Sequence, residues 1–189
     1  GLVGSEMCIR DRIGAVCRHP HRAVRIAPTQ HLYNEAEQSG RIMMFSCGVG
    51  NAVEYLFIVI YGWTGGADLK GMTERTDQLV QVALIQLEHL PRAPTFILGD
   101  LNAEPEHISH IHQLIQERHW VDVGAVANIW GGVDSEFTCI APASKAATRR
   151  DFVFCNPQAF PLIKDFQVKH DTNMPVHSML QITLRVEDA

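Results

Sequence analysis

Residues 95–98 form a strand-like apolar run that leads directly into a Gly-Asp-Leu-Asn turn at residues 99–102. Such a run is typical of a buried strand that ends at the edge of a sheet. The turn presents a carboxylate and an amide two residues apart, so that Asp100 can accept a proton while Asn102 holds an oxygen. Both side chains would be fixed to the rigid end of a strand. The alternative, and the more common use of an isolated Asp-x-Asn, is an Asx turn that caps the following helix.

Helical patterns lie on both sides of this strand. Thr73 is a good N-cap for a helix with an apolar face, and Pro91 ends that helix. Pro105 suits the first position of a second helix, in which apolar residues recur at helical spacing. Strands are predicted at residues 13–18, 22–27, 41–47, 54–61, 95–98, 137–140, 151–155, 162–168 and 180–186, with loops or turns at 28–40, 48–51 and 61–66. Two successive strand–helix–strand passages predict an α/β layered domain.

The composition fits a single globular domain. The chain has 189 residues, of which 46% are hydrophobic, and no apolar run of membrane-spanning length. No signal-peptide pattern is visible, and the five cysteines are scattered without a Cys-x-x-Cys pair, which favours reduced thiols in an intracellular protein. The net charge of −5 argues against tight nucleic-acid binding by long-range attraction, but carboxylates that hold a metal contribute to the same acidic excess.

Residues 1–12 have neither helical nor strand periodicity. The last six of these residues, MCIRDR, resemble a translated sequencing-adapter artefact. We therefore predict that residues 1–12 are a non-native segment and that the domain occupies residues 13–189.

Two further polar residues lie in apolar surroundings. Asp151 begins an apolar strand, where a lone carboxylate is costly unless it is paired, so a partner such as a histidine is expected. His177 lies just before the final strand, and a carboxylate bonded to its imidazole would fix its orientation. The simpler alternatives are an ion pair of Asp151 with Arg149 and a surface position for His177.

Four motifs together resemble the endonuclease/exonuclease/phosphatase superfamily, whose fold is that of DNase I. They are Tyr-Gly-x-Thr at residues 61–64, Gly-Asp-Leu-Asn at 99–102, Arg-x-Asp-Phe-Val-Phe at 149–154, and the late His177. The resemblance implies an α/β fold in which a two-sheet β-sandwich is flanked by helices in four α/β/β/α layers. It also implies that the N-terminal portion of the domain is missing.

The resemblance further implies metal-dependent cleavage of a phosphoester. Asp100 would activate or orient the attacking water, and Asn102 would hold that water and the scissile phosphate. Tyr61 would contact the phosphate. Asp151 would pair with His177, which would stabilise charge on the phosphoryl group, while Mg²⁺ or Mn²⁺ supplies most of the electrostatic stabilisation.

Two departures from the family pattern affect the metal site. The family ends in Ser-Asp-His, whereas the Asp position is Val176 here. The family's principal metal ligand is a Glu nearer the N-terminus, and no convincing Gln-Glu pair precedes residue 41. Truncation would explain the missing Glu, and a substitution explains Val176. The sequence therefore predicts an incomplete metal site and impaired activity.

Three functions remain open from the sequence. The sequences of residues 130–139, 148–151 and 175–177 resemble the endonuclease domain of LINE-type (non-LTR) retrotransposons. A retroelement endonuclease would have a DNA substrate, a nuclear location and a reverse transcriptase domain in the full-length protein. The second reading is a phosphatase or lipid phosphodiesterase of the same superfamily. The third is an inactive remnant that folds or binds only.

Two other groups of residues have simpler interpretations. His107, His110 and His112 lie close together in sequence, but no carboxylate or cysteine completes a metal site, which favours a solvated helix surface. Trp63 and Trp130 can stack on a base, although such residues more often lie at the rim of a core.

Overall fold

The computed structural model describes residues 13, 15, 22–48, 54–65, 70–140, 145–170 and 176–185. The segment predicted to be non-native, most of the strand predicted at 13–18 and most of the turn predicted at 48–51 lie outside the described residues. In chain order, the elements are β1 (Arg22–Arg25), α1 (His31–Gln38), β2 (Ile42–Gly48), β3 (Tyr55–Ile60), α2 (Lys70–Glu88), β4 (Thr95–Asp100), η1 (Pro105–His107), α3 (Ser109–Arg118), β5 (Val121–Asp122), η2 (Val123–Trp130), β6 (Cys139–Ile140), β7 (Ala147–Thr148), β8 (Asp151–Cys155), η3 (Phe160–Leu162), β9 (Ile163–Lys169) and β10 (Met179–Leu184).

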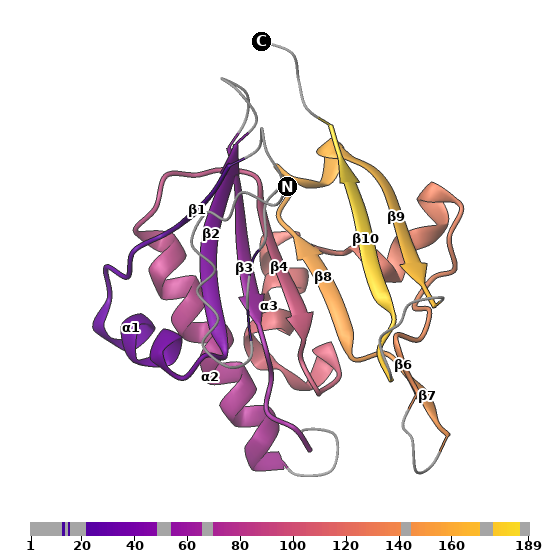
Figure 1. Ribbon diagram of the computed structural model, residues 1–189, viewed down its shortest axis with the longest axis horizontal. Helices are drawn as coiled ribbons and strands as arrows, with labels where there is room; N and C mark the ends of the chain where they lie inside the picture. The colour runs from indigo at the N-terminus through magenta and orange to yellow at the C-terminus, as the bar shows by residue number, and fades with distance from the viewer. Residues whose placement is uncertain are drawn as a thin grey trace, which may run out of the picture.

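A six-stranded sheet forms the centre of the molecule, with the strand order β1-β2-β3-β4-β8-β5. β3 and β4 are parallel neighbours, and α2 is the crossover helix between them. β4 and β8 are antiparallel neighbours, although about fifty residues separate them in the sequence. Two smaller sheets pair β9 with β10 and β6 with β7. Figure 1 shows the three α-helices grouped with β1–β4, and the β9–β10 pair on the far side of β8.

Each face of the central sheet carries its own apolar core. Side chains alternate along a strand, so that Ile97 of β4 joins the core with the helices while its neighbour Phe96 joins the core with β9 and β10. Both side chains are fully buried. The layers are therefore helices, a large sheet and a small sheet, and the predicted α/β fold class is confirmed. The predicted outer helical layer over the small sheet has no α-helix among the described residues; η2 packs against β8 and β9.

Several local predictions were wrong. Residues 28–40 were predicted as loop, but they contain α1, whose mostly polar sequence buries one aromatic side chain, Tyr33, completely. α2 begins at residue 70 rather than at a cap formed by Thr73, which is a buried residue inside the helix. The strand predicted at 137–140 is reduced to the two residues of β6. No helix within the described residues has both the length and the apolar character needed to cross a membrane.

Candidate active site at one end of the central sheet

Two carboxylates lie side by side because of the register between β4 and β8. Asp100 is the last residue of β4, Asp151 is the first residue of β8, and the two are direct partners across the antiparallel pair. Directly opposed residues project to the same face with Cβ atoms about 5 Å apart. Figure 1 shows that β3 and β4 end, and β8 and β10 begin, at the same end of the molecule. Pairing of the two strands therefore brings two acidic residues far apart in sequence into one site.

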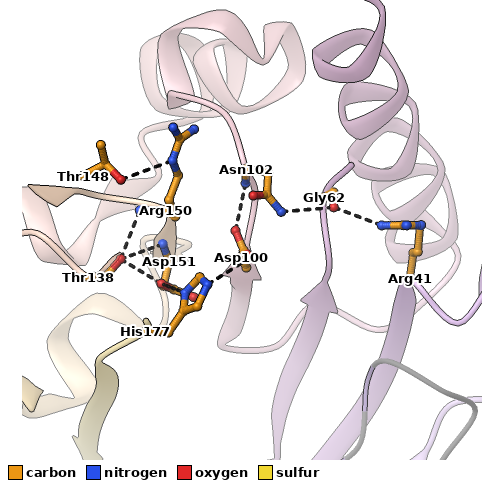
Figure 2. Close-up of polar contacts among 9 residues, drawn as sticks. All are labelled: Arg41, Gly62, Asp100, Asn102, Thr138, Thr148, Arg150, Asp151 and His177. Atoms are coloured by element: carbon orange, nitrogen blue, oxygen red, sulfur yellow. Dashed lines mark hydrogen bonds and ion pairs between the residues drawn. The ribbon is translucent and has the colours of Figure 1, made fainter. Parts of the chain in front are cut away.

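His177 completes a cluster with these carboxylates. Its Nδ1 lies 2.8 Å from Oδ2 of Asp151, within hydrogen-bond distance, and its Nε2 lies 4.0 Å from Oδ2 of Asp100, which is too far for a hydrogen bond. Figure 2 shows the imidazole between the two aspartates. The backbone around His177 is held by β6: His177 pairs with Cys139, and the N–H of Ser178 donates to the carbonyl of Thr138. A short strand far from the sheet centre thus places the imidazole.

Thr138 connects Asp151 to the segment that carries His177, and sequence reasoning did not select it as a site residue. Its hydroxyl donates to Oδ2 of Asp151 at 2.8 Å and accepts the backbone N–H groups of Arg150 and Asp151 at 3.0 and 2.9 Å. The residue is 1% exposed. The His177 imidazole bonds to the same Oδ2 atom, so two hydrogen bonds fix the orientation of the Asp151 carboxylate. The pairing of β6 with β7 helps to place Thr138 here, and that pairing has no local sequence signal.

The environment of Asp100 opposes its ionisation. Burial is the main cause that raises the pKa of Asp100 above its usual value, and the charge of the neighbouring Asp151 is the second. The side chain of Asp100 is 13% exposed, that of Asp151 18% and that of His177 35%. A carboxyl group with a raised pKa is better suited to accept or share a proton near neutral pH.

The turn after β4 is pressed against the end of β3. A Cβ atom on Gly62 would lie 2.1 Å from the carbonyl oxygen of Leu101, and one on Gly99, where φ is +141°, would lie 1.9 Å from the carbonyl oxygen of Ile60. Only glycine permits these approaches. They bring the Gly62 carbonyl to 3.3 Å from Nδ2 of Asn102, which donates to it.

An Asx turn is also present at this point. The carboxylate of Asp100 accepts the backbone N–H of Asn102 at 3.0 Å, and Asn102 has a left-handed φ of +53°. The turn does not cap a helix, because η1 starts only at Pro105 and its N-cap is Glu104. The local turn and the cluster therefore coexist: one Asp100 oxygen holds the turn and the other faces His177.

Tyr61 lies next to this turn but takes a different set of contacts. Its ring packs against the guanidinium of Arg41, 5.0 Å from the ring centroid, and none of the contacts described for the ring involves the Asp100–Asp151–His177 cluster. Arg41, which is 6% exposed, donates to the carbonyls of Tyr61 and Gly62. Figure 2 shows Arg41 and Asn102 converging on the Gly62 carbonyl from opposite sides. Arg41, which sequence reasoning missed, and Gly62, which it used only as part of the Tyr-Gly-x-Thr motif, therefore support the Asn102 side chain.

The cluster offers donors of the type that a hard divalent cation uses. Asp100, Asp151 and His177 are the only group of three or more potential metal ligands among the described residues, and one ligand atom from each lies within 4.8 Å of the others. Mg²⁺ is commonly held by one or two carboxylates, with waters and substrate phosphates as its other ligands. The two carboxylates fit such a cation. Few of the described ligand atoms are left for a cation, because His177 Nδ1 and Asp151 Oδ2 already bond to each other.

Other polar and aromatic residues considered from the sequence have partners outside the cluster. Arg149 pairs with Asp122 and not with Asp151, so the proposed Asp151–Arg149 ion pair was wrong. His110 lies 2.9 Å from a carboxylate oxygen of Asp77. Trp63 packs beneath the Arg41 guanidinium at 3.8 Å. Stacking on bases by the tryptophans stays a prediction.

A family comparison identifies the class of protein that carries this site. Residues 10–166 match the Endonuclease/Exonuclease/phosphatase family, and the chain belongs to that family. Its members hydrolyse phosphoesters and are in general metal-dependent. The match contains Asp100, Asn102 and Asp151 but ends before His177, so the family comparison does not cover His177, which the geometry joins to Asp151. A comparison with curated proteins gives no match.

Three solved structures illustrate the fold that this chain shares. The endonuclease domain of TRAS1, a telomere-specific non-LTR retrotransposon, is 16% identical with a TM-score of 0.59, over 92% of this chain and 73% of that one. The catalytic domain of Xenopus laevis APE2 is 18% identical with a TM-score of 0.58, over 82% of this chain and 59% of that one. The 3' phosphatase NExo from Neisseria, solved with a product DNA hairpin, is 14% identical with a TM-score of 0.55, over 77% and 65%. This chain thus spans less than two thirds of the APE2 and NExo chains.

Proposed function

We propose that this protein is a divalent-metal-dependent phosphodiesterase that cleaves DNA, and that it derives from a non-LTR retroelement endonuclease with an impaired metal site. The observation that carries the proposal is the register of β4 and β8, which opposes Asp100 to Asp151 and leaves His177 bonded to Asp151. The structural similarity to the TRAS1 endonuclease domain supports a retroelement origin, because that structure covers 92% of the chain. In this proposal the full-length protein includes a reverse transcriptase domain and acts in the nucleus.

The proposed roles follow from the contacts. Asp100 accepts a proton from the attacking water, for which a raised pKa suits it. Asn102, whose amide is held by the Gly62 carbonyl, orients that water and the phosphate. Asp151 keeps the His177 ring turned so that its Nε2 faces the reacting phosphoryl oxygen. Tyr61 contacts the phosphate through its hydroxyl, while its ring packs against the Arg41 guanidinium. A bound Mg²⁺ or Mn²⁺ would supply Lewis-acid stabilisation of the phosphoryl charge.

The proposed impairment rests on Val176. An apolar side chain stands where the family has a carboxylate, directly before His177 and 38% exposed. With two carboxylates in the described cluster, the affinity for a divalent cation should be low and the rate of cleavage slow.

Nicking of supercoiled plasmid DNA in Mg²⁺ or Mn²⁺ tests the proposal. We expect slow, EDTA-sensitive nicking that falls by about 100-fold or more in Asp100→Ala, because a proton acceptor in the reacting site is lost. Asp165→Ala, which changes a carboxylate of β9 that bonds to Gln167, is the matched control and should nick at the wild-type rate. Val176→Asp should nick faster than the wild-type chain.

Other outcomes select the other functions. Release of inorganic phosphate from a 3'-phosphorylated oligonucleotide, or of phosphocholine from sphingomyelin, without nicking would favour a phosphatase or lipid phosphodiesterase. Absence of all three activities, with no rise of the melting temperature in Mg²⁺ even for Val176→Asp, would favour an inactive remnant, since a ligand that binds only the folded state must stabilise it.

A further inference from the structure

Two adjacent arginines beside the cluster have different environments. Arg149 makes a two-pronged ion pair with Asp122, in which both side chains are 12–13% exposed, and its guanidinium also lies 4.6 Å from the ring centroid of Phe152. Its charge is therefore neutralised within the protein, and its role is to join β8 to β5.

Arg150, in contrast, has no ion pair with a carboxylate among the described residues. Its Nε donates to the hydroxyl of Thr148 at 3.4 Å, and no bond of its two terminal nitrogens is found within the described part of the chain. The residue is partly buried. Burial of an unpaired guanidinium is costly, so a site that keeps one is suited to an anion that is absent when the protein is alone.

The backbone of Arg150 is fixed to the cluster. Its N–H donates to the Thr138 hydroxyl at 3.0 Å, and its carbonyl accepts the N–H of Leu101 at 2.9 Å. Arg150, the residue before Asp151, is therefore bonded to Leu101, the residue after Asp100. Figure 2 shows its guanidinium extending away from the His177 imidazole, with Thr148 beside it. An anion held there would lie next to the cluster but not in it.

We infer that Arg150 binds a phosphate of a phosphodiester chain adjacent to the phosphate that faces Asp100, Asp151 and His177. This inference rests on the proposed function. The free fork of the guanidinium matches two phosphate oxygens, which is a contact that a lysine cannot reproduce. It also offsets the repulsion between a polyanion and the two carboxylates in a chain whose net charge is −5. A third guanidinium, that of Arg41, already donates to the Tyr61 and Gly62 carbonyls.

Salt-dependent binding of a fluorescein-labelled DNA duplex, followed by anisotropy in EDTA so that no cleavage occurs, tests the inference. Each phosphate contact contributes about 0.9 to the slope of log K against log salt for duplex DNA. Arg150→Met should therefore lower the slope by about 0.9 and weaken binding by roughly tenfold at low salt. Arg150→Lys should restore most of the slope but only part of the affinity, because the charge returns without the fork.

Lys164→Met is the matched control, because it removes one positive charge from an exposed position on β9. It should leave the slope unchanged. Arg150→Gln serves as a second neutral variant, and melting curves confirm that each variant is folded. An unchanged slope in both neutral variants overturns the role of Arg150 and leaves the proposed nuclease function intact. Failure of the wild-type chain to bind DNA at any salt concentration overturns DNA as the substrate and this inference with it.

Discussion

The two aspartates and the histidine of the cluster come from regions that are built in different ways. Asp100 and Asp151 belong to neighbouring strands in the interior of the six-stranded sheet, where Ile97 and Phe152 are at most 1% exposed. His177 precedes β10 of a two-stranded sheet, and its neighbour Val176 has a φ of +85°. β-branched residues rarely adopt this conformation. The carboxylates are thus preorganised by a core, whereas the imidazole depends on a few hydrogen bonds.

Those hydrogen bonds are concentrated in two places. Thr138 links the histidine region to β8, through its carbonyl on Ser178 and its hydroxyl on Asp151. His170 lies 2.8 Å from both the Ser178 hydroxyl and a Glu136 carboxylate oxygen, and joins the end of β9 to the same segment. We therefore expect the two carboxylates to keep their positions when the imidazole is displaced. A change that displaces the carboxylates should also displace the imidazole.

The largest effect is expected when the link between the two regions is cut. Thr138→Val keeps the shape of the side chain but removes the acceptor of two backbone N–H groups and the donor to Asp151. Leaving those groups without partners in a buried site should lower the free energy of unfolding by about 2–4 kcal/mol. Urea denaturation measures this change.

The control for this prediction is Thr183→Val, at an exposed position on β10. It should change the free energy of unfolding by less than about 0.5 kcal/mol. Equal denaturation midpoints for the two valine variants would show that Thr138 does not join the regions.

A smaller effect, of opposite sign, is expected within the histidine region. Val176→Asn replaces a β-branched residue at positive φ by one that tolerates this conformation, and should raise the free energy of unfolding by about 1 kcal/mol. Val133→Asn, at a surface position that is 62% exposed, is the control and should change it by less than about 0.5 kcal/mol. If both variants were equally stable, Val176 would not be strained.

The strained backbone at Val176 also bears on the departure from the family pattern. Aspartate is among the residues that tolerate positive φ, and aspartate is what the family resemblance places at this position. The conformation thus suits the residue expected from the family better than the residue present. This agreement supports the proposal that Val176 replaces the carboxylate that the family resemblance implies.

The sequence predicted the sheet interior better than its surroundings. The bounds of β8 were predicted correctly, and β4 differs from its prediction only by including Gly99 and Asp100, because continuous apolar runs next to turn residues are strong local signals. α1 was missed because a single buried aromatic leaves little periodicity in a polar segment.

The residues of the candidate site were likewise predicted only in part. Asp100, Asn102, Asp151 and His177 were selected from short motifs, and the structure brings them to one end of the sheet. Thr138 was missed because its place depends on the register between β6 and β7. Arg150 was missed because the sequence does not tell which of the two adjacent arginines forms an ion pair. Neither fact is encoded in a local pattern. Tyr61 was also selected from a motif; its ring contacts Arg41, and its contact with a phosphate stays a prediction.

The smallest predicted effect concerns the charge of Asp100 and tests how tightly the carboxylates are held together. Because burial and the charge of Asp151 raise the pKa of Asp100 in the folded state, the folded protein binds this proton more tightly than the unfolded chain does. The resulting stabilisation is complete below the pKa of the unfolded chain, at about 4, and is lost as the pH rises through the higher pKa of the folded state. Asp100→Asn cannot ionise and should not lose it.

Urea denaturation from pH 3.5 to pH 7.5, without divalent metal, should therefore show Asp100→Asn gaining stability relative to the wild-type chain as the pH rises, with the difference levelling off above the raised pKa of Asp100. The Asn102 backbone N–H keeps an acceptor in the variant, because an amide oxygen replaces the carboxylate oxygen that it contacts. Asp165→Asn on β9 should show no such rising difference. A difference that does not depend on pH would mean that Asp100 is solvated in the folded protein. The end of the six-stranded sheet and the segment that carries His177 would then not bury it.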